Sequence, residues 1–159
     1  MDDAALITAL EEHPTIDPIE GGYTVSNAVL DNEITIAYGD LVVHVRMPTI
    51  DEIVLNDDPS AIVVDGWFDA IARQLSDANG VVKGELTADT SVTRGQTEVS
   101  VTYRLRGTDA DGLAMDAKAL VDFVIGMYLQ SAIPGYEYDD PMRGLLGAAR
   151  ARGRSDVER

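Results

Sequence analysis

The chain has no cysteine among its 159 residues. This absence excludes disulfide bonds, zinc sites built on thiolates and cysteine nucleophiles. No apolar run approaches the ~20 residues of a membrane-spanning helix, so we expect no membrane partner. The acidic start Met1-Asp2-Asp3 also lacks the basic region of a secretory signal, and we expect a cytoplasmic protein.

Basic residues are scarce, at 12 against 28 acidic residues, and the formal net charge is −16. Lys83 and Lys118 are the only lysines. Such an excess of one charge repels itself in a compact fold, but at about 1 M salt the Debye length is only about 3 Å. The acids are spread over the whole chain, so the composition predicts adaptation to molar salt. An acidic interaction surface in an ordinary cell is the alternative.

The same shortage of bases bears on nucleic acid. Binding to duplex DNA or RNA depends on Lys and Arg contacts to phosphates, and high salt weakens these contacts steeply. We therefore expect no duplex nucleic acid partner for the acidic body of the protein.

Periodicity of the apolar residues predicts an α+β fold. Helical spacing alternates with segments in which every second residue is apolar. The expected helices lie at residues 2–13, 60–78, 111–132 and 142–151, and the expected strands at 23–25, 33–38, 41–47, 82–93 and 99–106. We expect an antiparallel sheet of about five strands with helices on one face. The order is α-β-β-β-α-β-β-α plus a short C-terminal helix.

Local signals refine these elements. Asp3 is the expected cap of the first helix, and Gly39-Asp40 the expected tight turn between two strands. In the two long strands, one phase is apolar and includes Met47. Its other residues are expected under the helices: Leu41, Val43, Val45, Val99, Val101, Tyr103 and Leu105. Six helix residues are also expected in buried contacts: Trp67, Phe68, Ile71, Leu120, Val124 and Tyr128.

Charge divides the chain into two parts. Residues 143–159 carry five Arg against Asp156 and Glu158, a net charge of +3, whereas the other 142 residues carry −19. We expect residues 1–140 to form a single α+β domain, and residues 141–159 a short helix and a basic, flexible tail. Such a tail either folds back on the acidic body, remains solvated or binds a partner.

Two surfaces are candidates for binding a protein partner. Arg46, Arg104 and Arg106 fall on the outward phase of their strands, where they form either a positive stripe or pairs with nearby acids, which is the interpretation we favour. On the helix at 111–132, Phe123 and Met127 widen the apolar surface beyond one stripe. This width predicts a homodimer with that helix or the one at 60–78 at the interface, unless the 142–151 helix folds back over it.

Nothing in the sequence points to catalysis. His13 and His44 have no ligand-spaced neighbours, and no phosphate loop or nucleophile elbow is present. The stretch around Asp109-Ala110-Asp111 lacks the twelfth-position Glu of a calcium loop. We therefore assign no catalytic, cofactor-binding or metal-binding residue, and expect no cofactor.

Two segments carry a family resemblance. Residues 65–69 (Asp-Gly-Trp-Phe-Asp) and 133–138 (Ile-Pro-Gly-Tyr-Glu-Tyr) resemble a family of small acidic haloarchaeal proteins of unknown function. The resemblance covers most of the chain but implies no activity. Separately, the order of elements is similar to the secretion-chaperone-like fold of small acidic dimers that hold partner polypeptides, although a fold does not by itself imply a function.

These observations favour a non-enzymatic protein-binding or chaperone-like module of a halophilic cytoplasm. The alternative is a small-molecule-binding protein or enzyme with a site between the sheet and the helix at 111–132. That site would use Tyr103, Tyr128 and Trp67 with nearby carboxylates.

Overall fold

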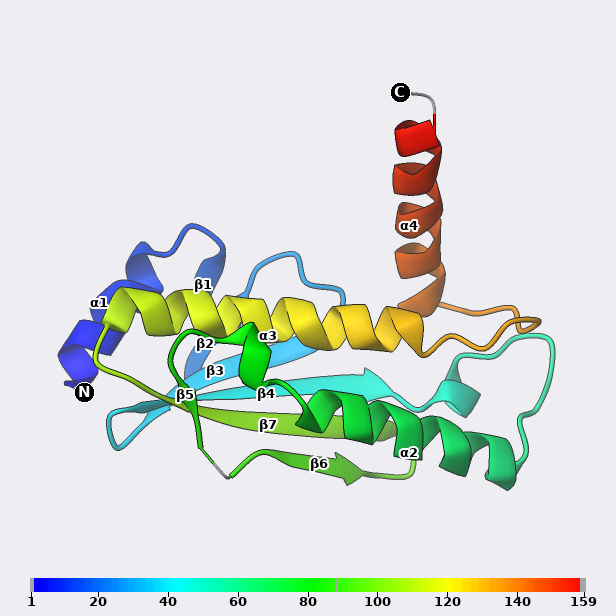
Figure 1. Ribbon diagram of the computed structural model, residues 1–159, viewed down its shortest axis with the longest axis horizontal. Helices are drawn as coiled ribbons and strands as arrows, with labels where there is room; N and C mark the ends of the chain where they lie inside the picture. The colour runs from blue at the N-terminus through cyan, green and yellow to red at the C-terminus, as the bar shows by residue number, and fades with distance from the viewer. Residues whose placement is uncertain (1, 88, 158–159) are drawn as a thin grey trace.

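The computed structural model describes residues 2–87 and 89–157, which form an antiparallel sheet of seven strands with helices packed on one face (Figure 1). The strand order is β1-β2-β3-β4-β7-β5, and β6 also pairs with β7. The strands are β1 (Ile16–Ile19), β2 (Gly22–Val25), β3 (Asp31–Ala37), β4 (Asp40–Pro48), β5 (Glu85–Leu86), β6 (Ser91–Arg94) and β7 (Glu98–Arg106). The α+β prediction is therefore confirmed, with seven strands rather than about five.

Three helices cover the sheet and a fourth projects from it (Figure 1). The helices are α1 (Asp3–Glu12), α2 (Ala61–Ser76), α3 (Ala110–Gln130) and α4 (Met142–Val157), with short 3-10 turns at Ile50–Glu52 and Asn79–Val81. α3 crosses the middle of the sheet, with α1 packed beside it at its N-terminal end and α2 toward the β6 edge. None of the described helices is long and apolar enough to cross a membrane.

The central strand pair β4–β7 carries the core. Val43 pairs with Tyr103 and Val45 with Val101, and all four side chains are fully buried. The residues predicted to lie under the helices are all buried, as is Met47 in the same phase, so the predicted strand phase is confirmed. The opposite phase forms a polar surface, which we call the open face, with Glu33, His44, Arg46, Thr102, Arg104 and Arg106.

The predicted strands differ from the structure in two places. β1 was not expected, because Pro18 interrupts its alternation; proline is tolerated there because β1 is an edge strand. The expected strand at 82–93 consists of two short strands on either side of a turn, within which the Thr87 hydroxyl accepts a hydrogen bond from the Asp89 amide. Hydroxyl bonds to the local backbone compete with strand pairing in this way.

The turn between β3 and β4 lies one residue earlier than predicted. Its central residues are Tyr38 and Gly39, at φ 52° and 78°, and Asp40 is already the first residue of β4. Two positive φ angles give the turn a twist that matches antiparallel strands, which is why this position rather than Gly39-Asp40 is used. The Tyr38 side chain is 97% exposed at the tip.

Helix ends and packing require three smaller corrections. Asp2, not Asp3, caps α1, because its carboxylate accepts the Ala4 amide. α4 extends to Val157, beyond the predicted end at 151. Phe68 is only half-buried, although the other five residues of its predicted set are buried. It lies under the Arg94 guanidinium, 5.6 Å from the ring centre, near the edge of the helical layer.

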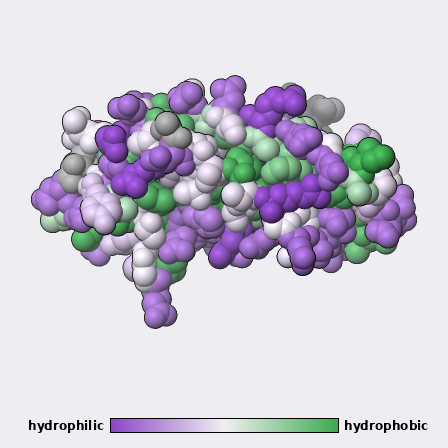
Figure 2. Space-filling view, turned by 90° about the horizontal axis from the view of Figure 1, so that it is seen from below, coloured by the Kyte–Doolittle hydropathy of each residue, from purple (hydrophilic) through white to green (hydrophobic). Residues whose placement is uncertain are grey.

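On the side that carries β6 and α2, hydrophilic residues are spread over the surface with apolar patches between them (Figure 2). The largest exposed apolar side chains are dispersed over several elements, among them Ile62 on α2 and Met115 on α3. The described surface therefore has the distributed polarity that the composition predicts.

Candidate functional site

The open face brings Arg104 and Arg106 together around one buried acid. Asp40, 5% exposed, receives hydrogen bonds from Arg104 Nε at 2.7 Å and from Arg106 Nε and Nη2 at 3.2 and 3.0 Å. Arg104 Nη2 also donates to the Ala37 carbonyl. This cluster ties the start of β4 to the end of β7.

The electrostatics of the cluster follow from these bonds. Hydrogen bonds from Arg106 and Arg104 hold the pKa of Asp40 below its ordinary value of 3.8, against the opposing effect of burial. Asp40 in turn raises the pKa of Arg106. Arg104 and Arg106 both pair with a carboxylate of their own chain. The first role of this three-residue cluster is therefore structural.

Replacing Asp40 with asparagine should lower the free energy of unfolding by about 1–3 kcal/mol, because the charged hydrogen bonds are lost. Since the folded pKa is depressed, the stabilisation is present above the unfolded value and disappears as the pH falls through the folded pKa. Denaturant titration in molar salt should show the two proteins converging at acid pH.

The matched control is Asp122→Asn, which removes an exposed partner of Lys118 on α3. It should cost less than about 0.5 kcal/mol at any pH. Equal losses for Asp40→Asn and Asp122→Asn would mean that the cluster contributes nothing beyond a surface pair.

Arg46 lies apart from this cluster. On β4 it faces Ser100 across the sheet, whereas Arg104 faces Val42, so the two arginines are about 13 Å apart along the strand direction. Arg46 lines a hollow of about 410 Å³ whose acidic residues are Asp31, Glu52 and Glu98. The three arginines therefore occupy two separate places on the sheet.

Phe123 and Met127 lie on α3, in the helical layer. Both are half-buried and pack against the core. The start of α4 also packs onto this layer, where Met142 is fully buried and Leu145 is 9% exposed. Another apolar side chain of α3, Met115, is 58% exposed. The structure thus does not join the basic and apolar candidates in one surface.

His44 belongs to a polar row that the sequence did not reveal. Across the open face, Glu33, His44 and Thr102 are register partners on β3, β4 and β7. His44 Nδ1 lies 2.8 Å from the Thr102 hydroxyl oxygen. A hydroxyl on an imidazole can serve nucleophilic chemistry when a pocket and oxyanion donors accompany it. Here it lies in the middle of an uncovered sheet face.

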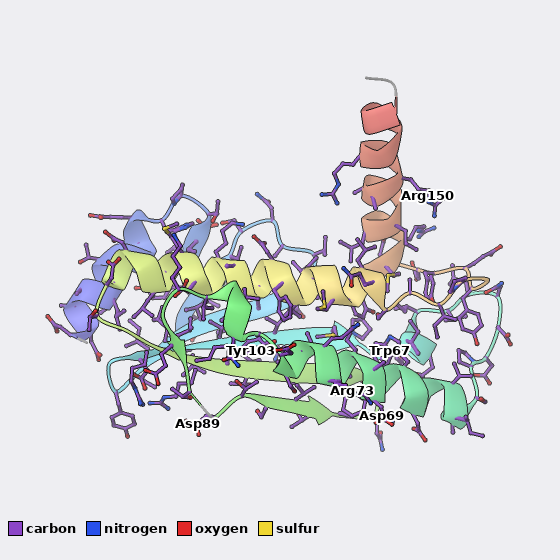
Figure 3. The ribbon with its side chains drawn as sticks, in the orientation of Figure 1. Trp67, Asp69, Arg73, Asp89, Tyr103 and Arg150 are labelled. Atoms are coloured by element: carbon purple, nitrogen blue, oxygen red, sulfur yellow. The ribbon has the colours of Figure 1, made fainter. Side chains whose placement is uncertain are left out.

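The space proposed for a small-molecule site, between the sheet and α3, is occupied by core side chains. Tyr103 and Tyr128 are fully buried, and their hydroxyls donate to the carbonyls of Leu75 and Pro48. Burial raises the pKa of both phenols. Trp67 packs edge-on to Tyr128, with ring centres 6.5 Å apart; Figure 3 shows Trp67 on α2 near the sheet. Its Nε1 is buried without a partner among the described residues.

Asp116 on α3 is a second buried acid, which the sequence motifs did not reveal. It accepts the backbone amides of Lys83 at 3.0 Å and Gly84 at 2.8 Å, and so fixes the segment before β5 onto α3. The sequence contains a signal for this burial. Asp116 lies three residues after Leu113 and four before Leu120, so helical spacing places it on the buried face of α3. Within the described residues, no group of three His, Asp or Glu side chains is arranged to hold a metal ion.

The projecting half of α4 is the most distinctive surface of the molecule. Figure 1 shows α4 leaving the C-terminal end of α3 and standing clear of the sheet and the other helices. We call residues 147–153 the arm. Within it, Ala149 is half-buried, while Gly147, Ala148, Arg150, Ala151, Arg152 and Gly153 are exposed. The Arg150 side chain points away from the body in Figure 3.

Comparison with known proteins gives a family but no activity. The model of a family described as "Family of unknown function (DUF5813)" matches residues 11–148. No curated protein and no solved structure gives a significant match. The matched range includes the whole sheet, α2, α3 and the start of α4, so the chain belongs to DUF5813, a family of unknown function.

Proposed function

We propose that this chain is a non-enzymatic, chaperone-like protein-binding module that works as a homodimer in a cytoplasm of molar salt. The observation that carries the proposal is the arm. An exposed helical segment with Arg150 and Arg152 projects from a body whose net charge is strongly negative. A helix that contacts so little of its own chain gains stability chiefly when it packs against something else.

The polar clusters of the body support the same proposal. Asp40 is held by two arginines and Asp116 by two backbone amides. Both acids therefore hold parts of the fold together, and their hydrogen-bonding capacity is used inside the chain. This favours binding through surfaces over chemistry in a site.

We test the proposal by affinity capture from the native lysate at about 3 M KCl, where acidic repulsion is screened. The bait is the full chain, and the matched control is the Arg150→Glu/Arg152→Glu chain. We expect the wild-type bait to retain a defined protein set, identified by mass spectrometry, that the control bait retains at a level at least about tenfold lower. Identical sets on both baits would contradict the proposed role of the arm.

One observation favours a small-molecule site instead. The unpaired Trp67 Nε1 is a donor that a small ligand would satisfy if it displaced core packing beside Tyr128. Trp67 is the only tryptophan, so its fluorescence reports on this place directly. A metabolite that shifts this emission and raises the melting temperature of the wild-type chain, but not of Trp67→Phe, would establish the alternative.

A further inference from the structure

A groove between α1 and α3 carries acidic side chains, opposite in charge to the arginines of the arm. It has a volume of about 400 Å³, and apart from two acids it is lined by Ala9, His13, Pro14, Ala114 and Met115. Glu12 at the end of α1 and Asp111 in the first turn of α3 lie on either side of it. We call this the α1–α3 groove. A largely apolar lining between acids suits a helix that has small residues flanked by bases.

The arm has that pattern. At 100° per residue, Met142, Leu145, Leu146 and Ala149 share the face of α4 that is buried or half-buried. The opposite face carries Gly147 and Ala151, with Arg150 on one margin and Arg152 toward the other. Small residues allow close approach, and the two arginines lie where they can meet acids on both sides of a groove.

The arm cannot reach the groove of its own chain. The groove lies at the N-terminal end of α3, beside Asp111 and Met115, whereas α4 starts after the C-terminal end. Between Met115 and Gln130 the helix rises about 22 Å. Figure 1 shows α1 at one end of the molecule and α4 at the other, pointing away from the sheet. An arm that occupies this groove must therefore come from another chain.

A second copy related by a two-fold axis suits this placement, because the arm and the groove lie toward opposite ends of α3. Two antiparallel copies set the α1 end of each near the arm of the other. The two contacts are then identical, and the assembly closes at two chains.

We propose that, while no partner protein occupies the arms, two copies of this chain exchange them, with residues 147–153 of each lying in the α1–α3 groove of the other and Arg150 and Arg152 pairing with Glu12 and Asp111. In this arrangement the exposed Met115 side chain packs against the small face formed by Gly147 and Ala151. The inference rests on the proposed homodimer and assigns its interface.

Charge exchange tests this interface in the full chain. The arm variant is Arg150→Glu/Arg152→Glu, and the groove variant is Glu12→Arg/Asp111→Arg. Each alone places like charges across both contacts, so its dimer should dissociate at concentrations about tenfold higher than the wild type. Mixed in equal amounts they restore opposite charges in both contacts, and the mixture should regain wild-type dimerisation. Circular dichroism in molar salt identifies any variant that fails to fold.

Disulfide trapping gives a second measurement that does not depend on charge. The chain has no cysteine, so Ala151→Cys and Met115→Cys introduce single thiols. On mild oxidation an equimolar mixture should form a mixed covalent dimer, whereas Ala151→Cys with Ser76→Cys, an exposed residue of α2, should not.

The outcomes separate the two proposals. A wild-type chain that is dimeric, but whose dimer is unaffected by both charge variants and not trapped by the 115–151 pair, overturns the arm exchange and leaves the homodimer. A wild-type chain that is monomeric in molar salt overturns both. An arm that binds an acidic protein of another kind would appear as charge-sensitive capture by a monomeric bait.

Discussion

In dilute buffer the chain should lose several kcal/mol of stability, and its melting temperature should fall by about 10 °C or more relative to about 2–4 M KCl. The physical cause is repulsion among 28 acidic residues that only 12 bases can offset. Acids that the structure leaves exposed, such as Asp57, Asp58 and Asp69, feel that repulsion once screening is removed. Thermal unfolding followed by circular dichroism across a KCl series measures the effect.

Two controls assign the effect to screening. Sucrose at matched water activity strengthens burial but does not screen charge, so it should recover only part of the stability. Asp57→Asn/Asp58→Asn should reduce the dependence on salt while leaving the protein folded. A melting temperature that is the same in dilute buffer and in molar KCl would refute the adaptation to salt.

Trp67→Ala should cost about 3–5 kcal/mol and Phe68→Ala only about 1–2 kcal/mol, although the two aromatic residues are adjacent. Trp67 is 5% exposed and packs edge-on to Tyr128 in the core. Phe68 is half-buried on the flank of α2 beneath Arg94, so truncation leaves a dent open to water rather than a cavity. Denaturant unfolding of both variants in molar salt provides the comparison.

The two results together test the orientation of α2. Both Trp67→Phe and Trp67→Ala remove the buried unpaired Nε1. Trp67→Phe keeps an aromatic ring in the core and leaves a smaller cavity, so it should be milder than Trp67→Ala. If Phe68→Ala proves the more damaging of the two alanine variants, α2 faces the sheet with a different side from the one described.

The inward residues of β4 and β7 were predictable because strand periodicity is strict. A shift of one residue would have placed Arg104 in the core and Tyr103 in solvent. β1 was not predictable in this way, since four residues containing Pro18 give no alternation to detect. The split between β5 and β6 depends on hydrogen bonds between Thr87 and Asp89. These local bonds replace strand pairing, and the alternation of the sequence gives no sign of them.

The arrangement of the candidate site residues was harder to predict. Periodicity identified the face that carries Arg104 and Arg106 but not their partner, because Asp40 lies 64 and 66 residues away in the sequence. The acids nearest to them in the predicted hairpin are Glu85, Asp89 and Glu98. Asp40 was instead assigned to the turn before β4. Because the turn lies one residue earlier, Asp40 is the first residue of β4, and its burial was not predicted.

The surface of α3 shows the same limit. Helical spacing identified Phe123 and Met127 as extra apolar residues, but it could not reveal that both pack against the core and that Met142 and Leu145 are buried beside α3. The homodimer predicted from that patch stays a prediction, and its proposed interface moves to the arm and the α1–α3 groove.

The proposed homodimer is tested most directly by the molar mass of the full chain at about 3 M KCl, measured by light scattering over a wide range of protein concentration. The account predicts twice the 17.1 kDa of one chain, with dissociation only on dilution. A mass of 17.1 kDa at every concentration would contradict it.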